Sequence, residues 1–475
     1  MPNYLAVDLG AESGRIMLGR LSADKLTVEE VHRFPNQPVE LPSGLYWDSF
    51  RLHHEIVHGL SITGRDRKLR VDGIAVDSWG VDFALTGPDG GLLECPRHYR
   101  DRRTNGVPER LFEVVPQREV FDRTGIQVMQ INTLYQLYAM RLLNAPALDI
   151  ADRLLFIPDL FSYWLTGVQR AETTIASTSQ FYDPVSRRFA TELLDQLGIP
   201  VRLLPDLIEP GDRLGTLLPS LAETTGLKDA SVYATAAHDT ASAVAAVPAE
   251  GNDWCYISSG TWSLMGVELC QPVITERSRE LNYTNEAGAG GSILLHKNMA
   301  GLWLLQECRR TWSSQGEELS YADLFQMAEE ASPARSILDP DQFQEPGDMP
   351  RRIVSWCRDR DLRPPETKGE ICRVILESLA RRYGEVIDGL ETLSGRRIRT
   401  IYIVGGGARI SLLNRLVASA TGRTVIAGPT EATAVGNILL QAIGSGQVAN
   451  AREAREIVSR SFSIEEFKPD HHAHS

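Results

Sequence analysis

The chain has 475 residues, of which 43% are hydrophobic and 23% charged, and its formal net charge is −13. This length exceeds what one ordinary hydrophobic core organises, so two large domains are expected. The acidic excess is spread along the chain, which argues against a nucleic-acid partner because such proteins need a basic face. No apolar run reaches the roughly 18–20 residues that span a bilayer, and the N-terminus has no signal-peptide pattern. We therefore expect a cytoplasmic protein without a membrane partner.

The six cysteines are scattered along the chain without a Cys-x-x-Cys pair, so zinc sites and thioredoxin chemistry have no support. In a reducing compartment most of them are expected to be free thiols in the core. Cys357 and Cys372 flank a proline-rich stretch and are the one pair for which a disulfide is considered. The reducing compartment argues against that bond.

The first predicted element is a β-hairpin near the N-terminus. Residues 4–18 read Tyr-Leu-Ala-Val-Asp-Leu-Gly-Ala-Glu-Ser-Gly-Arg-Ile-Met-Leu, two hydrophobic runs around a turn of small residues. Such a turn can point several backbone N–H groups into one small space, an arrangement that holds phosphate oxygens. Asp8 at its edge indicates either a Mg²⁺ ion held mainly through water or an acid that only shapes the turn. Arg15 could bind a phosphate oxygen with its forked donors or be an exposed strand residue.

The first half then alternates strand-like and helix-like segments. Residues 70–80 predict a buried strand, and apolar residues at helical spacing predict helices over 132–143 and 154–165. Trp79 and Asp82 follow the strand. An aromatic ring beside a carboxylate suits the binding of a polyol, although a buried Trp with a turn Asp is the alternative.

Residues 230–247 predict a strand that runs through a polar turn into a helix of small residues. Asp239 stands in this turn, between His238 and Thr240. A carboxylate there could accept a hydroxyl proton as a sugar oxygen attacks phosphorus. Asp also frequently caps a following helix, and the residue type taken alone favours that role.

A second hairpin is predicted about half a sequence after the first. Residues 254–267 read Trp-Cys-Tyr-Ile-Ser-Ser-Gly-Thr-Trp-Ser-Leu-Met-Gly-Val and repeat the pattern of two hydrophobic runs around a small turn. Thr261 in this turn can donate a hydroxyl to a phosphate, although Ser-Ser-Gly-Thr alone is more often only a turn. Together the two hairpins indicate a duplicated fold that closes on a nucleotide from both sides. Residues 248–253, just before this hairpin, are the best domain boundary.

The segments after this hairpin carry one candidate sugar ligand. Residues 298–306 predict a helix opened by Asn298, whose amide could bind a sugar hydroxyl or only cap that helix. Residues 333–365 are rich in proline and predict a loop. Residues 371–393 predict a long amphipathic helix.

A β-branched strand over residues 400–404 ends in a triple glycine and is followed by a predicted helix over 411–420. Such a turn brings backbone and a helix N-terminus against a ligand. Asn414, further along this helix, could bond a base edge or be an ordinary polar surface residue. Because helices lie between the strands, we expect mostly parallel sheets, with ligands at the carboxyl ends of the strands.

Three of these motifs, residues 7–15, 258–261 and 404–408, resemble the two phosphate motifs and the adenosine motif of the FGGY carbohydrate kinases. That family belongs to the actin, hexokinase and heat-shock-chaperone ATPase superfamily, and the match covers nearly the whole chain in order. More particular segments resemble the branch that phosphorylates L-rhamnulose: residues 77–83, 99–105, 238–242, 258–266, Asn298 and 301–306.

The resemblance implies an α/β fold of two duplicated ribonuclease-H-like domains, of the actin and hexokinase type, with a cleft between them. Residues 1–248 would bind the sugar and carry the first phosphate hairpin. Residues 249–465 would bind ATP, and residues 466–475 are expected to be a disordered tail.

The resemblance also implies roles for individual residues, with Asp239 as the proton acceptor. The phosphates of ATP would be bound by Ala11, Glu12, Ser13, Gly14 and Arg15. The rest of the ATP site would comprise Thr261, Gln306, the glycines Gly405, Gly406 and Gly407, and Asn414. Sugar contacts would come from Gly80, Asp82, His238, Asp239, Thr240 and Asn298.

Two positions qualify this assignment. Glu12 departs from the family pattern, which often has Ser or Thr there, so its side chain must point away from the phosphates. Cys357 and Cys372 occupy the region of a cysteine pair in the L-rhamnulose branch.

The implied reaction is phosphorylation of L-rhamnulose at its C1 hydroxyl, with ATP and Mg²⁺ as cofactors, in L-rhamnose catabolism. Closing of the cleft would exclude water, which otherwise competes as a nucleophile. A kinase for L-fuculose, xylulose or another ketose remains an alternative, because the hairpins contact only ATP. An actin-like or chaperone-like ATPase module is the non-enzymatic alternative, and Asp239 beside polyol-compatible side chains argues against it. The oligomeric state is left open.

Overall fold

The computed structural model describes residues 1–469, and contacts within the chain divide it into two compact units. Unit 1 comprises Met1–Pro248, Glu268–Leu295 and Ala432–Ser461, whereas unit 2 comprises Ala249–Val267, His296–Glu431 and the segment from Phe462 onward. The chain therefore changes unit at five points. The division into sequence domains 1–248 and 249–465 stays a prediction.

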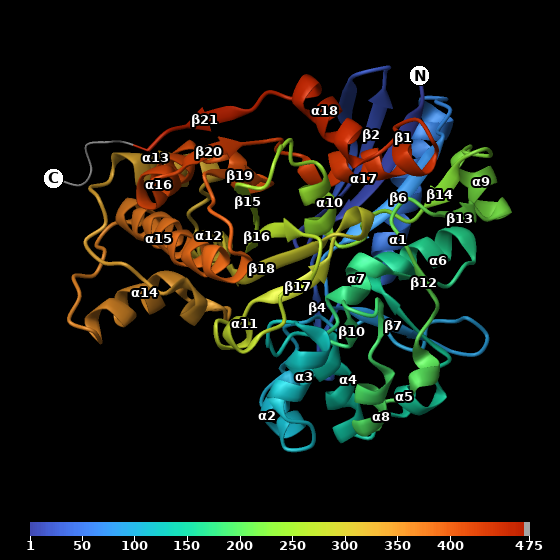
Figure 1. The fold of residues 1–475 in the computed structure, drawn as a ribbon, viewed down its shortest axis with the longest axis horizontal. Helices are drawn as coiled ribbons and strands as arrows, with labels where there is room; N and C mark the ends of the chain where they lie inside the picture. Colours follow the sequence, from blue (N-terminus) through green and yellow to red (C-terminus); the bar gives the residue numbers. More distant parts are fainter. Residues whose placement is uncertain (470–475) are drawn as a thin grey trace. The chain divides into compact units, whose positions relative to one another are not determined.

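The main sheet of unit 1 has six strands in the order β13-β14-β6-β1-β2-β3 (Figure 1). Strands β1 (Asn3–Leu9) and β2 (Ser13–Leu21) form the first predicted hairpin, which is confirmed. Strand β6 (Gly73–Ser78) lies parallel to β1. The expectation of a mostly parallel sheet is wrong, because only the pairs β1–β6 and β6–β14 are parallel. Tight hairpins join antiparallel neighbours, whereas parallel pairs need a crossover.

Helices cover both faces of this sheet. Helix α17 (Ala432–Gly444) contacts β1 and β6, and helix α1 (Ser49–Ser61) contacts β2 and β3. A Cβ on Gly19 would meet Ile438 of α17, whereas Ile16 packs on α1. Successive residues of a strand point to opposite faces, so the two helices sandwich the sheet.

The remaining strands of unit 1 complete its main sheet (β3, β13 and β14), join the second large sheet (β17) or form smaller sheets, and helices surround them. Its other strands are β3 (Leu26–Pro35), β4 (Val39–Leu41), β5 (Gly44–Tyr46), β7 (Phe83–Thr86), β8 (Arg153–Phe156), β9 (Ala171–Glu172), β10 (Tyr182–Asp183), β11 (Arg188–Phe189), β12 (Leu207–Ile208), β13 (Arg213–Thr216), β14 (Ser231–Tyr233) and β17 (Thr284–Ala287). Its other helices are α2 (Val107–Phe112), α3 (Gln117–Thr124), α4 (Thr133–Leu142), α5 (Pro146–Ile150), α6 (Ile157–Thr166), α7 (Thr173–Ser177), α8 (Thr191–Gln196), α9 (Pro219–Thr225), α10 (Asp239–Ala245), α11 (Glu276–Glu280) and α18 (Ala451–Ser461).

The helix predicted over residues 154–165 begins later than expected. Strand β8 takes up its first residues and pairs with β7, and α6 starts at Ile157 with Pro158 in its first turn. A continuous apolar run does not distinguish a buried strand from a buried helix, so periodicity alone missed the boundary. Proline in the first helical turn marks it, because its missing N–H costs nothing there.

The second large sheet has seven strands in the order β17-β18-β16-β15-β19-β20-β21, and its edge strand β17 is assigned to unit 1. Strands β15 (Trp254–Ser259) and β16 (Trp262–Leu269) form the second predicted hairpin, which is confirmed. The other strands are β18 (Ile293–Ala300), β19 (Thr400–Val404), β20 (Thr424–Ala427) and β21 (Glu465–Phe467). The helices are α12 (Trp303–Ser314), α13 (Tyr321–Glu330), α14 (Met349–Arg358), α15 (Lys368–Ser394) and α16 (Ser411–Thr421). The boundary between the units falls within β16 and within β18.

Two predictions in this part of the chain are wrong. Asn298 lies in β18, and α12 begins only at Trp303, so Asn298 neither opens nor caps a helix. The proline-rich residues 333–365 contain α14, whose N-cap is Asp348 and whose first turn contains Pro350. These prolines start structure rather than break it.

The predicted tail over residues 466–475 is wrong in its first part. Strand β21 pairs antiparallel with β20 and buries Phe467, which gains hydrophobic stabilisation there. Residues 470–475, which include the terminal histidines, lie outside the described residues.

The disulfide considered between Cys357 and Cys372 is not formed. Both are buried free thiols, in α14 and α15. Burial raises the pKa of Cys372 to about 12. The thiol of Cys372 interacts electrostatically with that of Cys308, whereas the thiol of Cys357 is hydrogen-bonded to Ser336. The two thiols thus have different partners.

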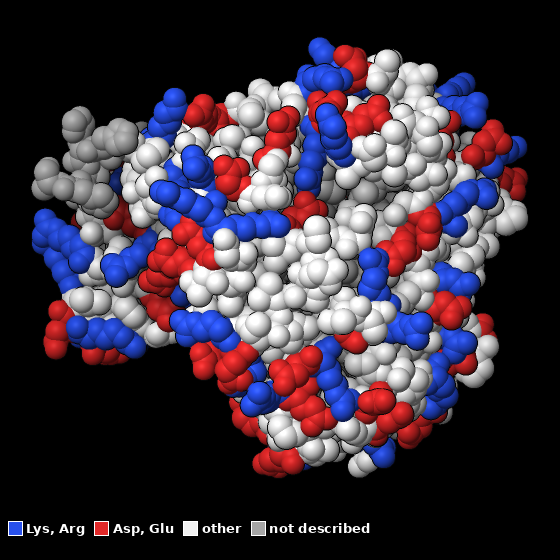
Figure 2. Space-filling model, in the orientation of Figure 1, with Lys and Arg blue, Asp and Glu red and all other residues white. Residues whose placement is uncertain are grey.

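Among residues 1–469, no helix is both long enough and apolar enough to cross a bilayer. On the face drawn in Figure 2, Lys and Arg side chains are interspersed with Asp and Glu side chains. Glu29, for example, forms ion pairs with both Arg20 and Arg67. Exposed pairs of this kind contribute little to stability, but they balance charge locally.

Candidate active site

Acidic side chains gather in unit 1 where β1 and β6 end and α10 begins. Asp8 of β1 and Asp77 of β6 are register partners on neighbouring parallel strands. The chain after β14 runs beside β6, because the N–H of Ser78 donates to the carbonyl of Ala237 at 2.9 Å. This contact brings Asp239 to the same edge of the sheet. Carboxyl ends of parallel strands are where ligands bind in α/β folds.

Asp239 is the first residue of α10, and its side chain is 33% exposed. Burial raises the pKa of Asp239, the neighbouring His238 lowers it, and Asp8 raises it. The N-cap of α10 is His238, and that residue makes no capping hydrogen bond with its side chain. The role of N-cap that residue type alone favoured for Asp239 is therefore wrong. Its carboxylate remains available to a ligand.

Asp8 is buried and forms an ion pair with Arg15, its register partner across the first hairpin. The phosphate contact expected of Arg15 stays a prediction. Mg²⁺ in phosphate-transfer sites keeps several waters and binds one or two carboxylates beside phosphate oxygens. Asp8 supplies such a carboxylate. Binding of a Mg²⁺ ion by Asp8 through water stays a prediction.

Asp77 was not selected from the sequence. It is fully buried, and the amide of Asn437 in α17 donates to its Oδ2 at 2.5 Å. Burial raises the pKa of Asp77 well above its ordinary value, and the nearby Asp8 raises it further. An Asp at the end of a buried strand was the available signal, but its pairing with the Asp8 strand is visible only in the fold.

The turn of the first hairpin contains the predicted phosphate ligands Ala11, Glu12, Ser13 and Gly14. The N–H of Gly10 donates to the carbonyl of Ser13 at 2.9 Å and closes the turn. Asn36 supports it from outside, since its N–H donates to the carbonyl of Glu12 and its amide to that of Gly10. The Glu12 residue is exposed. Phosphate binding by this turn stays a prediction.

In unit 2, two predicted ATP ligands contact one another. The Nε2 of Gln306, in α12, donates to Thr261 Oγ1 at 3.2 Å. The backbone also joins the two segments, because the N–H of Trp303 donates to the carbonyl of Thr261 at 3.1 Å. Residues predicted from separate motifs therefore form one polar group at the turn between β15 and β16.

The triple glycine packs against the same hairpin. Gly405 has a φ of 80°, which favours glycine. A Cβ on Gly407 would lie 2.1 Å from Ser259 Oγ of β15. Glycine is therefore required at both positions for this turn to approach the hairpin so closely. The hairpin turn follows β15 and the triple glycine follows β19. Because these two strands run parallel, both turns lie at the same edge of the sheet.

The two predicted asparagines differ in their surroundings. Asn414 is fully buried in α16, and its amide donates to the carbonyl of Ala408 at 3.0 Å. The reading of Asn414 as a polar surface residue is therefore wrong, and its contact with a base stays a prediction. Asn298 is half-buried in β18.

Asp82 is the centre of a buried aromatic cluster in unit 1. Its Oδ2 accepts hydrogen bonds from Trp47 Nε1 at 2.6 Å and Trp79 Nε1 at 3.0 Å, and its Oδ1 from Gln136 Nε2 at 2.9 Å. Burial raises the pKa of Asp82 to about 6, although these hydrogen bonds lower it. Asp82 is fully buried, and its predicted contact with a sugar stays a prediction. Asp82 orders the rings around it.

Gly80 lies in a strained loop that helix α7 holds. Val81 has a φ of 70°, which is rare for a β-branched residue. The N–H of Val81 donates to Thr178 Oγ1 at 3.0 Å, just after α7. A Cβ on Gly80 would lie 3.1 Å from the Thr178 side chain. Strained backbone held in this way is often found at ligand sites.

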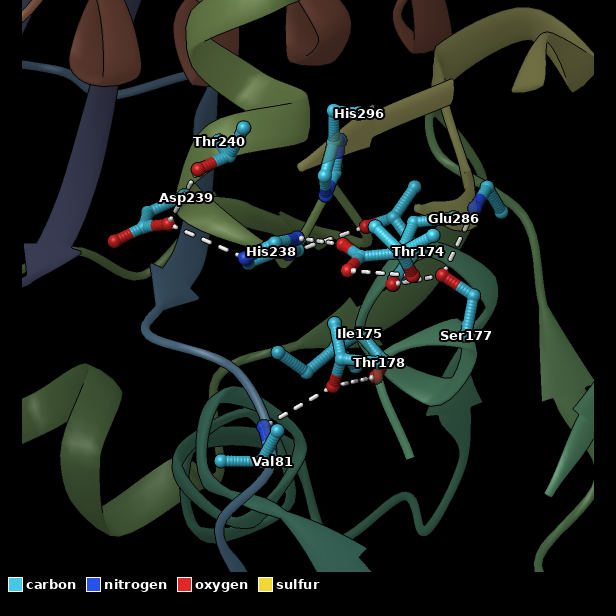
Figure 3. A network of polar contacts seen from close by, with 12 residues as sticks. Val81, Thr174, Ile175, Ser177, Thr178, His238, Asp239, Thr240, Glu286 and His296 are labelled. Carbon is cyan, nitrogen blue, oxygen red and sulfur yellow. Dashed lines mark hydrogen bonds and ion pairs between the residues drawn. The ribbon is translucent and has the colours of Figure 1, made fainter. Parts of the chain in front are cut away.

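His238 is buried between two carboxylates, as Figure 3 shows. Its Nε2 lies 3.5 Å from Oδ1 of Asp239, and its Nδ1 lies 3.0 Å from Oε2 of Glu286. Thr240 Oγ1 donates to the same Asp239 oxygen at 3.3 Å. The predicted residues His238, Asp239 and Thr240 are therefore together, and Glu286 joins them as a residue that the sequence did not indicate.

Comparison with known proteins matches both halves of the sequence to one family. The sequence model described as "FGGY family of carbohydrate kinases, N-terminal domain" matches residues 3–246, and that of the C-terminal domain matches residues 255–445. The rhamnulokinase of Bacteroides thetaiotaomicron is 44% identical over 98% of this chain and 96% of its own. That of Enterococcus faecalis is 39% identical over 97% and 93%.

Solved structures share the fold at low sequence identity. A ligand-bound xylulose kinase from Lactobacillus acidophilus superposes with a TM-score of 0.79 at 14% identity, covering 99% of this chain and 94% of that one. Glycerol kinase of Plasmodium falciparum with ADP gives a TM-score of 0.76 at 12% identity, covering 99% and 95%. With both family models and full-length relatives matched, the chain belongs to the FGGY family of carbohydrate kinases.

Proposed function

We propose that this protein transfers the γ-phosphoryl group of ATP to the C1 hydroxyl of L-rhamnulose, giving L-rhamnulose 1-phosphate and ADP. The observation that carries the proposal is 44% identity, over nearly the whole of both chains, to a protein named rhamnulokinase. The sugar kinases matched in structure alone are less than 20% identical and support only the fold. A cytoplasmic location and a role in L-rhamnose catabolism belong to the same proposal.

The sugar ligands proposed in unit 1 lie around Asp239. The contact of Asn298 with a sugar stays a prediction. Asp239 is the base, because its carboxylate is partly exposed and no capping role occupies it. His238 and Thr240 flank it, and Gly80 contributes from the loop held by α7.

In this proposal, Thr261, Gln306 and the triple glycine of unit 2 are ATP ligands. Thr261 and Gln306 would bind phosphate oxygens as the polar pair described above, and the triple glycine would admit the nucleoside against backbone. Asp8 would hold Mg²⁺ through water, and the ion would neutralise charge on the phosphates.

The chemistry requires one new bond, one broken bond and one proton transfer. The C1 oxygen of the sugar bonds to the γ-phosphorus, and the bond from that phosphorus to the β–γ bridging oxygen breaks. Asp239 receives the hydroxyl proton, which can leave late in a loose transition state. Catalysis then consists mainly of positioning and of N–H donors that stabilise charge on the phosphoryl oxygens.

A panel of sugars in an ADP-release assay tests the proposal. We expect the highest kcat/KM for L-rhamnulose among L-rhamnulose, L-fuculose, xylulose and glycerol. A higher value for another ketose would reject the substrate but keep the kinase. ATP turnover that is indifferent to sugars and stimulated by other proteins would instead indicate a chaperone-like module.

The variant Thr261→Val tests the ATP site. We expect the KM for ATP to rise about tenfold or more, because one hydrogen bond to a charged group is lost, with the KM for the sugar nearly unchanged. Thr261→Ser, which keeps the hydroxyl, should stay close to wild type. Thr392→Val, which alters an exposed hydroxyl on α15, is the control. A change confined to the sugar KM would assign this hairpin to the wrong substrate.

A further inference from the structure

The side chain of Glu286 is buried in β17, far in sequence from His238, yet lies against it. Only 4% of the Glu286 side chain and 7% of the His238 side chain are exposed. Oε2 of Glu286 lies 3.0 Å from Nδ1 of His238, on the opposite side of the ring from Asp239 (Figure 3). The three side chains therefore form a row, with the imidazole in the middle.

The backbone on both sides of this pair is anchored to the same short helix, α7. Thr174 Oγ1 accepts a hydrogen bond from the N–H of His238 at 3.1 Å. Ser177 Oγ accepts one from the N–H of Ala287, next to Glu286, at 2.9 Å. One helix thus fixes the separation between two segments that lie about fifty residues apart in the sequence. A precise contact between the side chains of His238 and Glu286 requires their backbones to be held in this way.

The charges around His238 favour an imidazolium. Burial lowers the pKa of His238, but Glu286, Asp239 and Glu172 together outweigh burial and raise it above the ordinary value. The negative charges of Asp8 on β1 and Asp77 on β6 lie near Asp239, whereas Arg15 on β2 pairs with Asp8 and lowers the pKa of Asp77. A doubly protonated imidazole ring carries an N–H on each nitrogen, so each of the two carboxylates faces one N–H group of the ring.

We propose that Glu286 is a positioning residue for phosphoryl transfer: it forms an ion pair with His238 on the Nδ1 side of the ring, holds Nε2 toward Asp239, and so orients the carboxylate that receives the sugar's proton. The proposal rests on the proposed function, in which Asp239 is the base. Glu286 itself touches no reacting atom. Removal of its charge leaves the ring free to rotate and to lose its proton, and Asp239 loses its oriented neighbour.

The test compares Glu286→Gln with wild type in kinetics and in pH dependence. We expect kcat to fall about 10–100-fold, as for partners that orient a functional group, with the KM for ATP nearly unchanged. The imidazolium is lost as pH rises, and without the Glu286 charge it is lost at lower pH. The alkaline limb of kcat should therefore shift to lower pH in the variant, a change that a purely structural defect would not produce.

The chain contains a matched control. His32 and Glu55 form a second His–Glu pair in unit 1, with Nε2 and Oε2 2.7 Å apart. Glu55→Gln removes an equivalent charge away from the site and should leave both kcat and the alkaline limb as in wild type. Glu286→Asp keeps the charge on a shorter side chain and should recover part of kcat together with the wild-type position of the limb.

An NMR titration of His238 in the free wild-type enzyme tests the pairing without turnover. We expect its pKa above the ordinary value of about 6.5, and a lower value in Glu286→Gln. A wild-type value below 6.5, or a Glu286→Gln enzyme with normal kcat and an unshifted limb, would overturn the proposal. An inactive wild type on every sugar would reject the proposed function, whereas the titration would still report on the pair. If Glu286→Gln does not fold, the wild-type titration and Glu286→Asp decide.

Discussion

We expect Asp239→Asn to fold like the wild type and to lose turnover by about 10²–10⁴-fold, the usual contribution of a general base. The substitution is nearly isosteric, and an asparagine Oδ1 can still accept the hydrogen bonds that Thr240 donates to Asp239. An amide cannot receive the hydroxyl proton, so the chemical step slows while the binding of both substrates is kept. The measurement is kcat by ADP release at saturating sugar and ATP, with thermal unfolding to compare stability.

Asp149→Asn is the control for that experiment, because Asp149 is an exposed acid in the first turn of another helix, α5. It removes the same favourable charge near a helix N-terminus and should leave turnover intact. If Asp239→Asn turns over at a near-normal rate, Asp239 serves only the structure of α10, and another group must accept the proton.

Gly436→Ala is expected to lower the free energy of unfolding of unit 1 by about 3 kcal/mol, toward the upper end of the usual cost of overpacking. A Cβ on Gly436 of α17 would lie 1.8 Å from the backbone carbonyl oxygen of Ser242 in α10. A backbone atom cannot rotate away, so the two helices must separate. Because α10 begins with Asp239, we also expect kcat to fall. Thermal unfolding should show a midpoint about 5 °C lower or more.

Gly215→Ala provides the matched comparison in the same unit. A Cβ on Gly215 of β13 meets nothing within 4 Å, and its backbone is not in the left-handed region. Its unfolding midpoint should stay at or slightly above that of wild type, because alanine restricts the unfolded chain. Equal midpoints for the two variants would mean that α10 and α17 do not pack as closely as the structure has them.

Local patterns predicted the elements whose residues carry their own turn chemistry. Both hairpins were found because small residues interrupt two hydrophobic runs, and the triple glycine because it follows a β-branched strand. Asp239 was found for the same reason, since a polar turn separates its strand from its helix. In each case the signal lies within about fifteen residues.

The remainder depended on contacts between distant segments. Asn298 lies in a strand because a neighbouring strand of the unit 2 sheet pairs with its segment, which overrides the helical pattern after it. Glu286 carries no local signal, and only the fold brings β17 to His238. The hydrogen bonds of Asp82 could not be predicted either, because Trp47 and Gln136 reach it from other parts of the chain.

The position of α17 has a consequence for how the protein is made. This helix covers β1 and β6, yet it is encoded near the end of the chain. At about 5–20 residues per second on a ribosome, the roughly 420 residues between Leu9 and Ala432 take about 20–80 s to appear. During that interval the apolar face that α17 later covers on β1 and β6 is exposed on the nascent chain. A chaperone bound to that face, or its temporary burial against other segments, would protect the new chain from aggregation.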